Sequence, residues 1–504
     1  MLKRKMSRRL EEWKAAPERT AFIMLGAHRT GKTSTIRNFA RNGYAALIEL
    51  NFMENPDGAA LLAGASSVDE LDSRLAQVTG RSIEPGTLVF FDEAQQLGQE
   101  AILLAKLLLE DERIDVVLSS SLLGTPLEGG GLFSDDAIRF DRMYPLDFEE
   151  FCWAIGVPDS EIAEVYRCYA AGQPLDEALH ERLMLAFRQY IVVGGMPESV
   201  QLFLDSDRNI EAARQRNSEI MDEQRYDTYA RMPARKTRSR SIFDDISAQI
   251  SKLAKRLSER LEAREAGGDT GSTAERARDE RAEGQPAVAG DEQPAVAGDA
   301  GGGEQPAVTD AATGKQARSG YSWMVETGFT LTASLALEPR HPLRSNEPSR
   351  KKTKLYSCDS GLLISRYSPS VARQAIADEG DASSLLVYAY ENVMAQQLAS
   401  AGFPLFYYNG RKGKIDFLIE DGSGSVVPLE VMAGDDYKEH LALDDLLDNE
   451  SDGIDRAYVL SEHNVSAGER GGKPIYYLPL YMSMCFEDER EDGASDLHLE
   501  EVEG

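Results

Sequence analysis

The sequence of 504 residues predicts an α/β fold in which helices cover both faces of a parallel β-sheet. Two observations support this fold class. A glycine-rich segment, residues 26–33, lies directly between an apolar run and a stretch with helical spacing. Further apolar runs then alternate with helical patterns, which is typical of parallel strands joined by helices. Because one hydrophobic core cannot serve a chain of this length, we expect two to four domains.

The expected elements of the first domain follow in chain order. Residues 3–16 have amphipathic spacing with Leu10 and Trp13 on one face, which predicts a short helix. The predicted strands are the apolar runs 20–25, 45–50, 88–91 and 115–119, and the predicted helices between them include 33–41 and 100–109. Residues 146–230 are mostly helical, with a break at 194–197.

The segment 26–33 reads Gly-Ala-His-Arg-Thr-Gly-Lys-Thr and predicts a phosphate-binding loop. Gly26 and Gly31 allow the backbone to curl, so that successive N–H groups point at phosphate oxygens. Lys32 can reach the β- and γ-phosphates, and Thr33 can offer its hydroxyl to Mg²⁺. We therefore expect ATP and Mg²⁺ as cofactors. The residues expected to contact the nucleotide are Gly26, Ala27, His28, Arg29, Thr30, Gly31, Lys32, Thr33 and Ser34.

A second motif, residues 88–93, is an apolar strand that ends in two carboxylates and fits a Walker B element. Asp92 would hold Mg²⁺ through its water shell. Glu93 would orient and polarise the attacking water as a general base. Together with Lys32, these residues predict ATP hydrolysis.

Two further sets of side chains are candidates for the catalytic site. The next predicted strand ends in three serines, of which Ser121 is either a sensor of the γ-phosphate or part of a serine-rich turn. Arg139 and Arg142 follow on another predicted strand. Either arginine could stabilise transition-state charge in a neighbouring subunit, which would imply a homo-oligomer, or could be a solvated residue on an edge strand.

The composition bounds the partners and the compartment. The net charge of −30 argues against non-specific adhesion to DNA or to an anionic membrane. The chain has no run of about 20 apolar residues and no signal peptide, so we expect a soluble, cytoplasmic protein without a membrane span. The cysteines lack CxxC spacing and predict neither a zinc site nor a disulfide; they are Cys152, Cys168, Cys358 and Cys485.

Two segments have an unusual composition. Residues 225–260 carry ten Lys or Arg against four acids, and they could contact a DNA backbone or dock on the protein's own acidic surface. Residues 263–320 contain Gln-Pro-Ala-Val three times and almost no large apolar side chains, which predicts a disordered insertion. The alternative is a tether that binds a partner.

The order of the motifs resembles that of prokaryotic AAA-superfamily ATPases that carry a C-terminal restriction-endonuclease-like domain. The resemblance covers nearly the whole chain except the insertion and the acidic tail. The motifs that carry it are 26–33, 91–95, 119–121, 143–151, 194–197, 354–356, 359–363, 415–417 and 428–431.

This resemblance implies a domain organisation. We expect an AAA-type ATPase core at 1–155, a helical lid over the nucleotide at 156–230, and a winged-helix-like module at 231–365, interrupted by the insertion. A restriction-endonuclease-like domain would follow at 366–486, with an acidic, disordered tail at 487–504.

The resemblance also implies a second metal site, because Glu391, Asp416 and Glu430 match the acids that bind a divalent metal and activate water on DNA. The lysine expected two residues after Glu430 is Met432, whose thioether cannot stabilise developing charge. Lys438 or Lys414 could compensate. We expect a binding domain without cleavage, coupled to the ATPase. The alternatives are an ATP-regulated, metal-dependent DNA endonuclease and a nucleotide-binding scaffold with little hydrolysis.

Overall fold

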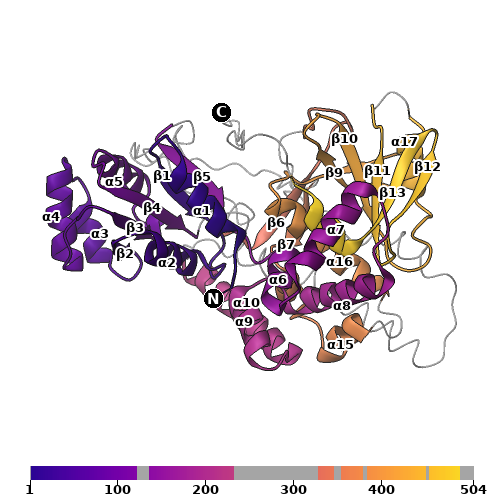
Figure 1. Cartoon of the computed structure of the whole chain (residues 1–504), viewed down its shortest axis with the longest axis horizontal. Coiled ribbons are helices and arrows are strands. Elements are labelled where there is room, and N and C mark those ends of the chain that lie inside the picture. Colours follow the sequence, from indigo (N-terminus) through magenta and orange to yellow (C-terminus); the bar gives the residue numbers. More distant parts are fainter. Residues whose placement is uncertain are drawn as a thin grey trace, which may run out of the picture.

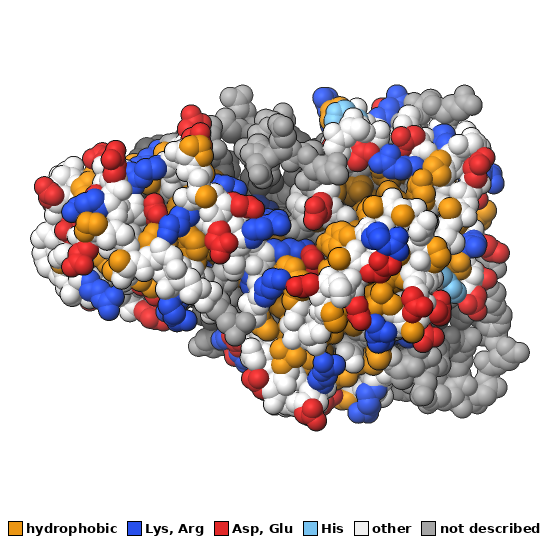
Figure 2. Space-filling model, in the orientation of Figure 1, with side chains coloured by type: hydrophobic (Ala, Val, Ile, Leu, Met, Phe, Trp, Pro, Cys, Tyr) orange, Lys and Arg blue, Asp and Glu red, His pale blue; other side chains and the backbone are white. Residues whose placement is uncertain are grey.

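Two β-sheets organise the part of the chain that the computed structural model describes, which comprises residues 2–121, 136–231, 327–345, 353–377, 383–449 and 453–487. Each sheet lies in its own α/β lobe, at the left and at the right of Figure 1. Basic and acidic side chains are interspersed over the visible face of both lobes (Figure 2).

The first sheet is parallel throughout, with the strand order β2-β3-β4-β1-β5. Its strands are β1 (Ala21–Leu25), β2 (Ala46–Asn51), β3 (Thr87–Asp92), β4 (Ile114–Ser120) and β5 (Ile138–Arg142). The prediction of a parallel sheet with strands near 20–25, 45–50, 88–91 and 115–119 is therefore confirmed. β4 lies between β3 and β1, so its carboxyl end lies between the carboxyl ends of these two strands.

Helices cover both faces of this sheet because successive strand residues point to opposite sides. Phe22 and Phe90 face a core with Trp13 of the first helix, whereas Ile23 and Phe91 face a second core. The predicted amphipathic helix is α1, and its buried face includes Leu10 and Trp13. The helices of this lobe are α1 (Lys5–Ala15), α2 (Lys32–Gly43), α3 (Pro56–Leu62), α4 (Val68–Thr79), the short 3₁₀ turn η1 (Ala94–Gln96) and α5 (Gln99–Leu109).

The second sheet is mixed, with the order β12-β13-β11-β10-β9-β8-β6-β7. Its strands are β6 (Thr330–Leu335), β7 (Thr353–Ser357), β8 (Phe406–Asn409), β9 (Lys414–Glu420), β10 (Val426–Val431), β11 (Ala457–Ser461), β12 (Ser466–Arg470) and β13 (Lys473–Pro479). We expected residues 330–337 in a winged-helix-like module. In the structure β6 instead pairs in parallel with β8, where Ser334 lies opposite Phe406, so this strand extends the C-terminal sheet.

The helices after β5 share one large core with the second sheet. Phe187 packs against Phe148 and Tyr390, with ring centroids 5.0 and 6.4 Å apart, and Phe417 belongs to the same core. These helices are α6 (Phe148–Ile155), α7 (Asp159–Ala171), α8 (Glu177–Val193), α9 (Pro197–Asp205) and α10 (Ile210–Arg231). The later ones are α14 (Ser360–Ile364), α15 (Pro369–Ala377), α16 (Ser383–Ser400), α17 (Leu441–Leu447) and the 3₁₀ helix η5 (Leu480–Cys485).

Several predictions fall outside the described residues. The insertion 263–320, nearly all of the acidic tail and the side chains of the basic segment 225–260 lie there. The four cysteines are free and buried. Within the described ranges, no helix is both long enough and apolar enough to cross a membrane.

Candidate functional site

The phosphate loop connects β1 to α2, and its two glycines are required for different reasons. Gly31 has φ +98°, a left-handed conformation that side chains disfavour. At Gly26 a Cβ atom would lie 2.3 Å from the carbonyl oxygen of Met143, because the chain after β5 passes directly over the loop. The loop is therefore held in its curl both by its own conformation and by the segment that follows β5.

Lys32 lies inside this curl. Its Nζ donates hydrogen bonds to the carbonyl oxygens of Gly26 and Ala27, each over 2.9 Å. Burial lowers the pKa of the Lys32 ammonium, against the opposing effects of Glu93 and Asp92. The loop thus holds a buried positive charge among backbone groups, as a phosphate-binding loop requires.

The two residues predicted to hold Mg²⁺ are in direct contact. The Thr33 hydroxyl donates to Asp92 Oδ2 over 3.0 Å, and the Asn51 amide donates to the same oxygen over 3.0 Å. Ser119 Oγ donates to Asp92 Oδ1. Asn51 is a site residue that sequence analysis missed, although a polar residue at the carboxyl end of the strand beside β3 was a signal for it.

Glu93 follows β3 with φ +56° and is buried. Its Oε1 accepts a hydrogen bond from Ser121 over 2.6 Å, and Gln95 donates to its Oε2. Burial alone would raise the pKa of Glu93, but Lys32, Ser121 and Gln95 together hold that pKa below its ordinary value. The carboxylate is therefore ionised at neutral pH, in the state that can accept a proton.

The predicted arginines lie on β5, which pairs with β1 at the edge of the sheet. Arg142 lies opposite Leu25, the last residue before the phosphate loop, and both Arg139 and Arg142 are half-buried. Between them, Asp141 pairs with Arg9 of α1 over 2.7 Å. The role of either arginine in a neighbouring subunit stays a prediction.

Arg29 joins the phosphate loop to the second lobe. Its guanidinium pairs with Glu198 of α9 over 2.7 Å and with Glu223 of α10 over 2.6 Å. Arg216 of α10 pairs with the same two glutamates. Sequence analysis assigned Arg29 to the nucleotide; its partners lie 169 and 194 positions further along the chain, and the sequence gives no sign of them.

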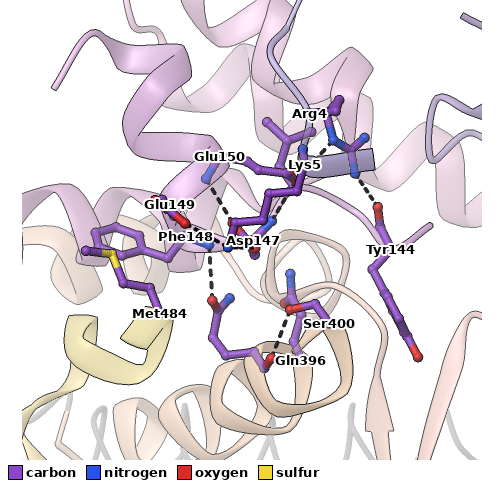
Figure 3. A network of polar contacts seen from close by, with 12 residues as sticks. Arg4, Lys5, Tyr144, Asp147, Phe148, Glu149, Glu150, Gln396, Ser400 and Met484 are labelled. Atoms are coloured by element: carbon purple, nitrogen blue, oxygen red, sulfur yellow. Dashed lines mark hydrogen bonds and ion pairs between the residues drawn. The ribbon is translucent and has the colours of Figure 1, made fainter. Parts of the chain in front are cut away.

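The N-terminal residues form a second connection between the lobes (Figure 3). Arg4 donates to the carbonyl oxygen of Thr30 in the phosphate loop over 2.8 Å and pairs with Glu150 of α6 over 3.0 Å. Lys5 pairs with Asp147 over 2.7 Å and with Glu149 over 2.8 Å. Burial would lower the pKa of Lys5, but these two carboxylates raise it above its ordinary value.

Within the second lobe, hydrogen bonds join the motifs 143–151, 194–197 and 359–363 to one another. The Leu146 N–H donates to the Gly195 carbonyl oxygen over 2.7 Å, and the Gly195 N–H donates to Asp359 Oδ2 over 2.5 Å. A Cβ atom on Gly195 would lie 2.0 Å from the Leu146 carbonyl oxygen. Burial raises the pKa of Asp359 to about 6, although backbone N–H groups oppose the shift.

The three acids of the predicted second metal site, Glu391, Asp416 and Glu430, are buried on α16, β9 and β10. Met432 packs in an apolar core, and Lys438 lies over the rings of Tyr437 and Tyr477. A lysine that sequence analysis did not consider, Lys354 of β7, contacts two of the acids. Among the described residues, no three His, Cys, Asp or Glu side chains are grouped so that they could hold a metal ion.

Comparison with known proteins identifies the first lobe. Residues 18–152 match the family model described as "AAA domain", so this part of the chain is an AAA-type P-loop domain. The match includes the phosphate loop, Asp92, Glu93 and both candidate arginines. A search of curated proteins finds no match.

Three solved structures were compared with the whole chain. The C. elegans PCH-2 structure has 15% sequence identity and a TM-score of 0.24, over 42% of this chain and 65% of that one. The Aeropyrum pernix ORC1 protein in complex with DNA has 14% identity and a TM-score of 0.25, over 75% and 93%. The S. cerevisiae Hsp104-ADP complex has 15% identity and a TM-score of 0.27, over 52% and 40%.

Proposed function

We propose that this protein is an Mg²⁺-dependent ATPase that couples its nucleotide state to a C-terminal binding domain that does not cleave nucleic acid. The observation that carries the ATPase part is the ionised Glu93 beside Lys32, next to an Asp92 that is already fixed to Thr33. The AAA domain supports the same conclusion.

Each of these side chains has a distinct role in hydrolysis. Thr33 and Asp92 would hold Mg²⁺, and their hard oxygen atoms suit that ion. The ion would supply charge neutralisation on the phosphates. Lys32 binds phosphate oxygens, while Glu93 orients the attacking water and accepts its proton. Ser121 and Gln95 keep the Glu93 carboxylate in place.

The contacts between the lobes support the coupling part. Glu198 and Glu223 belong to the second lobe and hold Arg29 of the phosphate loop. Arg4, which reaches into the second lobe, holds Thr30 of the same loop. A change in the loop on nucleotide binding would therefore act directly on α9, α10 and the start of α6. The proposal also includes DNA as the partner, bound through residues 225–260 or the C-terminal domain. It further includes a homo-oligomer with an arginine finger.

Replacement of Glu93 by Gln tests the ATPase. The variant keeps the shape of the side chain and its contact with Ser121 but loses the base, so we expect ATP binding to persist while kcat falls by about 100-fold or more. Glu110→Gln, at an exposed position after α5, is the matched control and should leave kcat unchanged. Normal turnover by Glu93→Gln would remove Glu93 from its role.

A further inference from the structure

The C-terminal lobe buries three carboxylates that come from different elements, and we name Glu391, Asp416 and Glu430 the acidic cluster. Their exposed fractions are 3%, 2% and 5%. Buried carboxylates are costly unless a cation or hydrogen-bond donors compensate their charge. The cluster therefore needs cations or hydrogen-bond donors close to it.

Lys354 of β7 supplies such a cation. It is itself only 6% exposed, and its Nζ lies 2.8 Å from Glu391 Oε1 and 3.9 Å from Asp416 Oδ1. The ammonium also lies 5.1 Å from the centroid of the Tyr407 ring, whose face favours a cation. A single lysine thus stands between the helix acid and the first strand acid of the cluster.

Two further hydrogen bonds engage carboxylate oxygens of these acids that a metal could use. Glu391 Oε1 also accepts a hydrogen bond from the Tyr356 hydroxyl over 2.6 Å. Asp416 Oδ2 accepts the backbone N–H of Val431 over 3.1 Å. Oxygens that face an ammonium, a phenol and an amide do not form the open oxygen site that Mg²⁺ takes. The donor set present here does not fit the divalent metal that the family resemblance implies.

We propose that the Lys354 ammonium is a built-in cation that takes the place of the divalent metal in the acidic cluster. It neutralises part of the buried charge, excludes a metal ion, and fastens β7 to α16 and β9. The inference rests on the proposed non-cleaving C-terminal domain and gives a reason for it. Met432 agrees with this role, because the position where the resemblance expects a lysine is part of an apolar core.

The position of Lys354 along the chain links the cluster to the contact between Gly195 and Asp359. β7 carries both Lys354 and Tyr356 and ends two residues before Asp359, whose carboxylate accepts the Gly195 N–H. Lys354 and Tyr356, which both anchor β7 to Glu391, therefore hold the strand that leads into this contact. Lys354 acts here as a positioning residue.

Mn²⁺ titration of the full-length chain tests the proposal. All variants carry Asp92→Asn and are kept free of nucleotide, so that the phosphate-loop site contributes no metal binding. We expect no Mn²⁺ binding at the cluster of the parent chain, and a new Mn²⁺ site in Lys354→Met. Addition of Asp416→Asn should abolish that site, and Lys354→Arg, which keeps the charge, should bind no Mn²⁺.

Two results would overturn the proposal: Mn²⁺ binding by the parent chain that Asp416→Asn removes, or a folded Lys354→Met chain that gains no site. Because loss of one partner of a buried ion pair is strongly destabilising, Lys354→Met could fail to fold. The comparison of the parent chain with Asp416→Asn then still decides the matter. A failure of the ATPase proposal would appear in the turnover of Glu93→Gln and would leave these Mn²⁺ titrations unchanged.

Discussion

The contact between Asp359 and Gly195 predicts a specific dependence of stability on pH. Burial raises the pKa of Asp359 from 3.8 to about 6. The folded chain therefore binds this proton more tightly than the unfolded chain does. The resulting stabilisation is fully present below pH 4 and is lost as the pH rises through 6. A shift of about two units corresponds to about 3 kcal/mol in total, of which roughly 1.3 kcal/mol is lost between pH 5 and 7.

Asp359→Asn isolates this effect, because the variant shares every other titrating group with the parent chain. The asparagine amide cannot accept the Gly195 N–H and the Leu362 N–H through two oxygens, which adds a constant cost of about 1–3 kcal/mol. Urea unfolding at pH 5, 6 and 7, followed for the second lobe, gives the free energy of unfolding of each chain. We expect the advantage of the parent chain over Asp359→Asn to shrink by roughly 1.3 kcal/mol from pH 5 to 7.

The test is whether the stability difference between the parent chain and Asp359→Asn falls as the pH rises. An ordinary surface aspartate would give a difference that does not vary with pH in this range. An aspartate paired with a cation would also give almost no change between pH 5 and 7, because its pKa values in the folded and unfolded chain both lie below this range. Either outcome would refute the conclusion that burial dominates the environment of Asp359.

Two more substitutions test the contacts of Arg29 and of Gly195. Arg29→Ala removes two partly exposed ion pairs, so the free energy of unfolding should change by less than about 1 kcal/mol. The ATP-dependent change in amide hydrogen exchange of α9 and α10 should be lost. An exchange response equal to that of the parent chain would exclude Arg29 from the coupling. Gly195→Ala places a Cβ atom 2.0 Å from a backbone oxygen and should destabilise the chain by at least about 3 kcal/mol. Gly156→Ala, where φ is positive but no atom lies within 4 Å, should cost only about 1 kcal/mol, and equal losses in thermal unfolding would contradict the steric argument.

The sequence was most informative where the deciding interactions are local. The phosphate loop lies between a strand and a helix that are contiguous with it, and Asp92 ends an apolar run, so both could be predicted from neighbouring residues. Ser121 could be placed beside the Walker B strand because consecutive parallel strands end at the same edge of a sheet. Asn51 ends the preceding strand and could have been found by the same reasoning.

The sequence was least informative where a side chain depends on a distant partner. Lys354 is paired with Glu391 across 37 positions, and only the fold of β6, β7 and α16 brings the two together. Arg29 matches a variable position of the phosphate-loop motif, so its pairing with Glu198 could not be anticipated. For the same reason the strand 330–335 could be predicted, but its place beside β8 could not.

Three contacts meet at one short segment, residues 143–150, and they bear on the proposed coupling. The Met143 carbonyl lies against Gly26, Arg4 bridges Thr30 and Glu150, and Leu146 is bonded to Gly195. Because the Gly26 and Gly195 contacts are backbone against backbone, neither can yield through a change of side-chain rotamer. In the proposed coupling, a displacement of the loop by nucleotide would act on this segment, and through it on the start of α6 and on the Asp359 contact. The proposed coupling needs no long chain of side chains, because this one segment touches both the phosphate loop and the second lobe.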